Sequence, residues 1–135
     1  MHKELSVDTI KPEALKCKLL NVSYNALEEK NGPYGIIVND ICNSVNIKDD
    51  IVTFVFQRNV NTDKNLLFEI VVKVETSVKF KREDNYSDKD YQEFFKNNYM
   101  YYYRSTGVAS SISLIVGQIT SSFGRQPLLV AFKDK

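Results

Sequence analysis

The side chains that enzymes use for acid–base and nucleophilic chemistry are sparse in this chain of 135 residues. The single histidine, His2, lies at the amino terminus, where chains usually fray, so no histidine-based triad is expected. The five glycines are scattered and form no phosphate-binding loop. Glu69 and Glu75 alternate with Lys73 and Lys79, which fits solubility and cross-strand pairing better than a catalytic carboxylate pair. The sequence therefore predicts that the protein is not an enzyme and needs no cofactor.

The two cysteines, Cys17 and Cys42, lie in different apolar segments, with no CxxC motif and no histidine nearby. Free cysteine packs as a small hydrophobic residue, so we expect both thiols to be buried and reduced, and we expect no metal site. Arg104 and Arg125 flank a predicted helix, and either could bind an anion or a partner carboxylate. Local pairing is the commoner role of such arginines.

A cluster of tyrosines is the most unusual feature: Tyr99, Tyr101, Tyr102 and Tyr103 lie within five residues. Tyrosine offers a large, fairly rigid apolar surface with a polar tip, and it is favoured where a surface binds a partner. An equal alternative is that half of these rings belong to the core and the others cover the sheet edge. RNA stacking ranks low because no basic surplus accompanies the rings.

Bulk composition points to a globular protein, with 43% hydrophobic and 26% charged residues. The net charge of +1 argues against a nucleic-acid partner, because phosphate binding demands a basic surface. No apolar run reaches the roughly 18 residues of a membrane span, and residues 1–11 lack the apolar core of a signal peptide. We expect one domain over residues 1–135, in the cytoplasm and without membrane insertion.

The stretch that organises the chain runs from Asn65 to Lys81, where polar and apolar residues alternate. The apolar side begins at Leu66 and ends at Phe80, and the other side carries the charges. A period of two predicts a long strand with one buried and one solvated face. A strand of about 15 residues exceeds the usual length, so we expect a bend, a bulge or an interface with another subunit.

Three earlier segments are predicted to be neighbouring antiparallel strands. Ala14 to Leu27 favours a strand over a helix, and its apolar parity switches near Leu19 and Leu20, which indicates a bulge. Tyr34 to Ile47 is a weaker, edge-like strand. Its apolar positions of shared parity are Ile37, Ile41, Val45 and Ile47. Ile51 to Val60 is rich in β-branched and aromatic residues.

The last third of the chain is helical in character. Ser87 is a predicted N-cap of a helix that runs to Asn98. An aromatic corner follows, and a second helix is expected from Arg104 through Ser121, before Gly124. The predicted fold class is therefore α+β, with an antiparallel sheet of about four strands followed by two C-terminal helices packed on one face.

The segment from Phe95 to Phe132 has a distinctive order of features. A helix leads into an aromatic corner, and an arginine, a second helix, a glycine, a proline and a short apolar tail follow. The residues concerned are Asn98 to Tyr103, Arg104, Ile112, Ile115, Ile119, Phe123, Gly124 and Gln126 to Leu129. In this order and spacing the segment resembles the SecB family of export chaperones. The preceding layout of four strands also matches the family.

The resemblance implies a holdase, which binds unfolded or extended polypeptides without ATP, assembles as a dimer or tetramer, and acts in protein export or with a toxin–antitoxin system. Candidate peptide-binding residues are Phe94, Phe95, Tyr99, Tyr101 and Tyr102. Candidate oligomer-interface residues are the small side chains of the second helix, Ala109, Ser110, Ser113 and Gly117.

The family's export members meet the SecA motor through acidic sheet residues, whereas the long strand here mixes Glu69 and Glu75 with Lys73 and Lys79. This mixture argues against docking on SecA and leaves room for SecB-like members with other clients. Two further functions remain open: a small-ligand-binding helix-on-sheet domain, and a dedicated adaptor for a single client.

Overall fold

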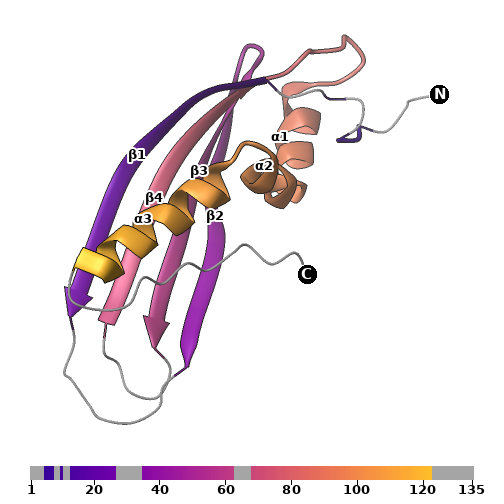
Figure 1. The fold of residues 1–135 in the computed structure, drawn as a ribbon. Helices are drawn as coiled ribbons and strands as arrows, with labels where there is room; N and C mark the ends of the chain where they lie inside the picture. The colour runs from indigo at the N-terminus through magenta and orange to yellow at the C-terminus, as the bar shows by residue number, and fades with distance from the viewer. Residues whose placement is uncertain (1–4, 8–9, 11–12, 27–34, 63–67, 123–135) are drawn as a thin grey trace.

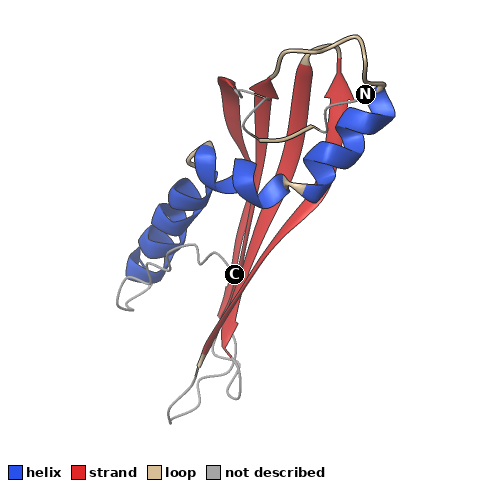
Figure 2. Cartoon of the chain, turned by 90° about the vertical axis from the view of Figure 1, so that its right-hand side faces the viewer, coloured by secondary structure: helices blue, strands red, loops and turns tan. Residues whose placement is uncertain are grey.

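The structure is a computed structural model that describes residues 5–7, 10, 13–26, 35–62 and 68–122. Its described part is an antiparallel sheet of four strands followed by three helices that lie on one side of the sheet (Figures 1 and 2). The strands are β1 (Glu13–Ala26), β2 (Ile36–Lys48), β3 (Ile51–Thr62) and β4 (Phe68–Lys79). The helices are α1 (Asp88–Asn97), α2 (Tyr99–Ser105) and α3 (Val108–Ser122). The predicted α+β class is confirmed.

The strand order is β1-β4-β3-β2, so β1 and β2 form the two edges of the sheet. Strands β2, β3 and β4 pair with their neighbours in sequence, and β1 crosses over to pair with β4 from Glu13, opposite Lys79, to Ala26. The tight turn between β2 and β3 uses Asp49 in the left-handed region, with φ at 56°. The chain therefore places its first strand beside its last.

Strand β4 shows the predicted alternation. Every second side chain, from Phe68 through Thr76 to Val78, is buried, and the residues between them are partly or fully exposed. The strand has 12 residues, which is shorter than expected, and the predicted start at residues 65–67 lies outside the described residues. The helices pack against the buried face of the sheet to which these residues belong.

The first segment forms a strand, β1, as predicted in preference to a helix. Its pairing with β4 shifts in register between Leu19 and Asn21, where the bulge was predicted. Two further register shifts, between Ala14 and Lys16 of β1 and between Cys42 and Ser44 of β2, were not predicted. Because a bulge moves the following residues to the other face, Ile37 does not share a face with Val45, although the two have the same parity. The single-face prediction for β2 is therefore wrong.

Helix α1 begins as predicted at Ser87. The Ser87 hydroxyl accepts a hydrogen bond from the Asp90 amide, and the Asp90 carboxylate accepts one from the Ser87 amide at 2.8 Å. This capping box satisfies two amides that would otherwise lack partners. Gln92 of the same helix donates to the main-chain carbonyl of Val45, which ties α1 to β2.

The tyrosine cluster forms a helix of its own, so the described residues contain three helices where two were predicted. Helix α2 ends where the Thr106 hydroxyl donates to the Tyr102 carbonyl and Gly107 takes a φ of 81°. Helix α3 consequently begins at Val108 and not at Arg104. The predicted glycine stop at Gly124 and the apolar tail lie outside the described residues.

The core lies between the helices and the sheet and is unusually aromatic. Rings from β3 meet rings from α1 and α2, with centroid distances such as 4.8 Å between Phe56 and Tyr103. Its fully buried aromatic residues are Phe54, Phe56, Phe80, Tyr91, Phe95, Tyr102 and Tyr103. None of the helices in the described residues is long and apolar enough to cross a bilayer.

Candidate binding surface

Of the five candidate peptide-binding residues, some are buried and the others are accessible to solvent. Phe95 and Tyr102 are fully buried, and Phe94 is 9% exposed. Tyr99 is partly buried, and Tyr101 is 36% exposed at the surface of α2. In this protomer, therefore, only the rings of Tyr99 and Tyr101 can contact a partner without a rearrangement of the α1–α2 junction.

Tyr102 is held by rings on several sides. Its ring stacks on Phe54 of β3 at 5.4 Å, meets Phe95 of α1 edge-on at 5.2 Å, and meets Tyr101 at 90° and 5.2 Å. The Tyr102 hydroxyl is the one buried side-chain polar atom in the described residues that has no hydrogen-bond partner. Burial raises the pKa of this hydroxyl above its ordinary value.

A buried polar network, which the sequence analysis missed, connects the sheet to both later helices. Arg58 of β3 donates from Nε and Nη2 to the two carboxylate oxygens of Asp40 on β2, at 2.7 and 3.0 Å. Its Nη1 donates to the hydroxyl of Ser113 on α3 at 2.8 Å, and Tyr103 of α2 donates to Asp40 at 2.8 Å. Four elements therefore meet at one guanidinium.

The electrostatics of this network follow from burial and pairing. Burial alone would lower the pKa of Arg58, but the hydrogen bond and the charge of Asp40 more than offset it, so the pKa is raised. Burial raises the pKa of Tyr103, and the nearby Arg58 only partly counteracts this effect. Arg58 is thus a permanent cation, and Tyr103 a neutral donor, throughout the ordinary pH range.

The candidate oligomer-interface residues do not share one face of α3. Ala109 and Gly117 are buried with Ile112 and Val116, which places them against the protomer's own core. Ser113 is partly buried and bonds to Arg58. Ser110 is the exposed member of the set. Two of these small residues therefore permit close packing of α3 inside the protomer.

An apolar strip on β1 is the most accessible hydrophobic part of the sheet's helix-facing side. Leu19 pairs with Val74 and Val22 with Val72, so each shares a face with a fully buried or nearly buried valine. Yet Leu19 is 50% exposed and Val22 is 37% exposed. We call Cys17, Leu19 and Val22 the β1 strip. It is exposed because β1 lies at the sheet edge, while the helix above packs on β4.

Cys17 belongs to this strip and is exposed, so the prediction of a buried thiol is wrong for this residue. The Thr76 hydroxyl donates to its sulfur at 3.9 Å. Cys42 is partly buried and free, and burial raises the pKa of its thiol. An exposed thiol on the strip provides a natural position for a chemical probe.

Helix α3 lies diagonally over the sheet, and its C-terminal end points toward β1 (Figure 1). Its outward side carries Leu114, which is 61% exposed. Ile115 and Ile119 are partly buried at the edge of the core. The β1 strip and α3 together therefore offer aliphatic surface that the protomer leaves uncovered in its described part.

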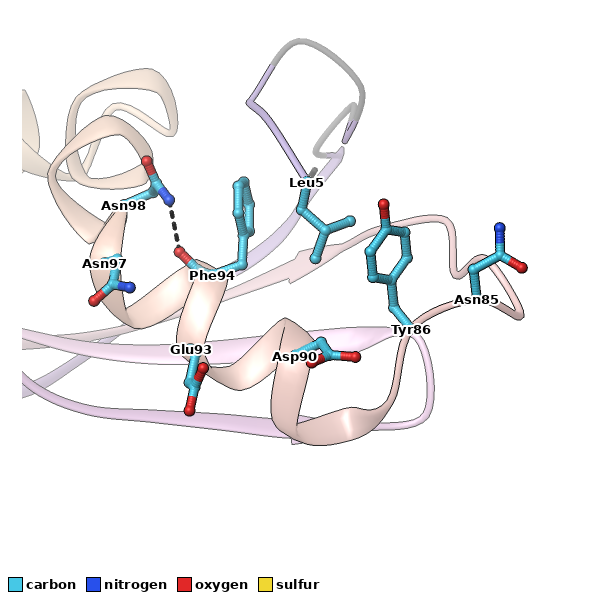
Figure 3. Close-up of a pocket in the computed structure, with 8 residues that line it drawn as sticks. All are labelled: Leu5, Asn85, Tyr86, Asp90, Glu93, Phe94, Asn97 and Asn98. Atoms are coloured by element: carbon cyan, nitrogen blue, oxygen red, sulfur yellow. Dashed lines mark hydrogen bonds between the residues drawn. The ribbon is translucent and has the colours of Figure 1, made fainter. Parts of the chain in front are cut away.

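A separate hollow of about 760 Å³ lies beside α1 and the amino-terminal segment (Figure 3). Asn98 donates to the Phe94 carbonyl at its edge, and Asp90 is engaged in the capping box. Its lining residues are Leu5, Asn85, Tyr86, Asp90, Glu93, Phe94, Asn97 and Asn98. Small-molecule sites are usually enclosed and mostly apolar, and this open, amide- and carboxylate-lined hollow is neither. The described residues also contain no group of three metal-ligating side chains.

Comparison with known proteins identifies the fold. No protein-family model matches the sequence, and no curated protein matches it. Among solved structures, the chain is similar to the SecB-like chaperone Rv1957 of Mycobacterium tuberculosis, solved in complex with a ChAD peptide from the Rv1956 HigA1 antitoxin. The TM-score is 0.71 over 91% of this chain and 90% of that chain, at 7% sequence identity.

A second structure, a protein of unknown function from Streptococcus agalactiae, has a TM-score of 0.46 at 8% identity and covers 91% of this chain and 98% of that chain. The first similarity shows that this chain has the SecB-like fold, as its C-terminal sequence pattern predicts.

Proposed function

We propose that this protein is an ATP-independent chaperone, a holdase, which binds unfolded or extended polypeptides along the β1 strip and the adjoining side of α3. The observation that carries the proposal is the exposure of Leu19 and Val22 on a sheet face that is otherwise buried. Contiguous apolar surface of this kind usually marks a site of interaction. Such a function requires no catalytic group and no cofactor.

The geometry of β1 suits an extended client. In the described part of the chain, β1 pairs only with β4, so one edge of the strand offers main-chain groups to a further strand. An extended polypeptide that adds to a sheet edge gains main-chain hydrogen bonds that do not depend on its sequence. The aliphatic side chains beside this edge would then hold the apolar side chains of the client.

The aromatic junction between α1 and α2 supplies the other proposed client contacts. Tyr99 and Tyr101 are accessible in the protomer, and Phe94, Phe95 and Tyr102 would join the site only if the α1–α2 junction opened. We retain all five as proposed client contacts, with the two accessible tyrosines first. Tyrosine loses little conformational entropy on binding, which suits a site that accepts varied sequences.

The fold neighbour supports a polypeptide client, because that SecB-like chaperone was solved with a peptide from an antitoxin. We propose the same class of client here: a polypeptide that belongs to a toxin–antitoxin system or that is bound for export. We also propose that the protein acts in the cytoplasm as a homo-oligomer. Ser110, which is exposed on α3, is the residue of the proposed interface set best placed to meet a second subunit.

The test compares two faces of one strand. The variant Leu19→Ser/Val22→Thr removes apolar surface from the strip, and the control Asn21→Ser/Ser23→Thr changes neighbouring residues of the same strand on the outer face. We expect the first variant to lose suppression of aggregation of an unfolded client protein and the control to retain it. Equal suppression by the strip variant and the wild type would reject the site.

A native probe gives an independent readout of the same surface. Cys17 is exposed within the strip, so an excess of an unfolded client should slow its modification by a thiol reagent. Cys42 is partly buried and lies on β2 at the opposite edge, and it serves as the internal reference. Unchanged Cys17 labelling in the presence of bound client would place the client elsewhere.

A dedicated adaptor remains the second candidate, because the fold neighbour was solved with a peptide from one particular antitoxin. A panel of unrelated unfolded proteins separates the two functions. A holdase prevents the aggregation of several members, whereas an adaptor binds one peptide and ignores the others.

A further inference from the structure

We propose that the hydroxyl of Tyr102 donates a hydrogen bond to a main-chain carbonyl of the bound client. This inference rests on the proposed function and assigns a chemical role to one residue of the site. It begins from the Tyr102 hydroxyl, the one buried side-chain polar atom without a partner among the described residues. A buried polar group without a partner is rare in native proteins and calls for a physical reason.

Tyr103, the next residue, differs from Tyr102 in having a partner for its hydroxyl. Tyr103 is equally buried, and its hydroxyl donates to Asp40 at 2.8 Å. The Tyr102 ring makes a full set of contacts with Phe54 and Phe95, which phenylalanine would make equally well. The hydroxyl therefore adds nothing to the packing of the protomer, and leaving it unpaired costs stability.

An extended polypeptide carries the acceptor that this hydroxyl lacks. Every residue of an extended client presents a main-chain carbonyl, and a client segment that pairs with no strand leaves these carbonyls free to accept. A phenol that donates to a carbonyl holds the client without reading its sequence. Such a contact is what a protein with many clients requires.

Tyr101 is the accessible aromatic neighbour of Tyr102. Its ring stands perpendicular to that of Tyr102 at a centroid distance of 5.2 Å, and it is 36% exposed. A surface tyrosine changes rotamer on a fast timescale, so Tyr101 can move readily when the α1–α2 junction opens to bring a client to Tyr102. The short helix that carries both rings also lacks a side-chain hydrogen bond at its N-cap, Asn98.

The test is the variant Tyr102→Phe, with Tyr103→Phe as the matched control for loss of a buried tyrosine hydroxyl, because Tyr103 is equally buried and is not a proposed client contact. We measure the melting temperature and the dissociation constant for a fluorescent, unstructured peptide with several apolar residues. The melting temperature of Tyr102→Phe should equal or exceed that of the wild type, because an unpaired hydroxyl is removed. Its affinity should fall by about 3- to 10-fold, the usual worth of one hydrogen bond.

A peptide with a modified main chain can identify which client carbonyl accepts the hydrogen bond. A peptide with a thioamide at one position presents a weaker acceptor there, and we scan the thioamide along the peptide. At one position the wild type should lose affinity, and Tyr102→Phe should show no further loss at that position. This non-additivity identifies the carbonyl that meets the hydroxyl.

The outcomes separate this inference from the proposed function. If the wild type binds the peptide and Tyr102→Phe binds it equally well, the hydroxyl does not serve the client and the inference fails alone. If the wild type binds no unfolded polypeptide, the proposed function fails and takes the inference with it. A large fall in melting temperature for Tyr102→Phe would show that the hydroxyl has a partner inside the protomer, and this too overturns the inference.

Discussion

Arg58 and Asp40 face each other across β2 and β3 and form an ion pair with two hydrogen bonds, while the Arg58 side chain is only 1% exposed. The same pair reaches α2 through Tyr103 and α3 through Ser113. Its net contribution to stability is small in principle, because desolvation of both ions offsets their attraction. Its geometric contribution is larger, because it fixes where two helices lie over the sheet.

Removing one partner of this pair should be severe. Arg58→Met leaves the carboxylate of Asp40 in the interior without its counterion, and we expect the free energy of unfolding to fall by about 3–5 kcal/mol. The double variant Arg58→Met/Asp40→Leu should recover most of that loss. The control is Lys79→Met, because Lys79 pairs with Asp50 at 3.9 Å on the exposed surface, where such pairs contribute at most about 1 kcal/mol. Urea denaturation gives the free energy of unfolding of the wild type and the three variants. An equal loss of this free energy in Arg58→Met and Lys79→Met would contradict the role given to Arg58.

Stability should decline at alkaline pH because of the buried tyrosines. Burial raises the pKa of Tyr102 and Tyr103 in the folded protein, while tyrosine in the unfolded chain ionises near pH 10. Below pH 10 both states hold the protons and stability is unaffected. Above it the unfolded chain releases protons that the folded protein keeps, so the free energy of unfolding falls as pH rises.

The variants test this alkaline effect one group at a time. Tyr102→Phe and Tyr103→Phe should each make the loss above pH 10 shallower, by up to about 1.4 kcal/mol per pH unit. The same urea titrations between pH 6 and pH 8 are the reference, where these hydroxyls contribute no slope. A wild-type slope that persists in both variants would place the alkaline sensitivity elsewhere.

The connection between α2 and α3 depends on the backbone of Gly107. Its φ of 81° disfavours side chains, although an added Cβ would meet no atom within 4 Å. Gly107→Ala should therefore cost about 1–2 kcal/mol from backbone strain alone. Gly107→Asn should cost less, because asparagine tolerates the left-handed region. Thermal unfolding compares the three proteins, and an alanine variant as stable as the wild type would show that this turn can change its conformation freely.

The start of α1 offers a test of local structure. Ser87→Ala removes the hydroxyl that accepts from the Asp90 amide at 3.3 Å, and the expected loss is about 1 kcal/mol. Ser111→Ala, at an exposed position of α3, provides the control and should change stability by only a few tenths of a kcal/mol. If both variants unfold at the same temperature, the capping box contributes nothing measurable.

Local signals in the sequence predicted much of the fold. The alternation along β4, the parity switch at Leu19 and the serine before α1 each depend on residues close together in the chain. The helix α2 could not be predicted in this way, because its run of aromatic residues has no clear period. Packing of Tyr102 and Tyr103 on β3 decides its conformation.

The proposed binding surface was harder to predict because it depends on strand order. Leu19 and Val22 have the pattern of core residues, and only the position of β1 at the sheet edge leaves them exposed. The Arg58 network gave one usable signal, since Arg58 has the same parity as Phe54, Phe56 and Val60. Its partner Asp40 precedes an unpredicted bulge in β2, so the face of the sheet on which Asp40 lies could not be predicted from its parity.

The pairing of β1 with β4 also has a consequence for biosynthesis. The ribosome makes β1 first, but the strand that pairs with it, from Glu13 opposite Lys79 to Tyr24 opposite Ile70, is the last of the four to emerge. The hairpin of β2 and β3 can close meanwhile, because its contacts are local. Until β4 is complete, the nascent chain displays an unpaired β1 with its aliphatic residues, so this protein passes through a stage at which it would itself benefit from a holdase.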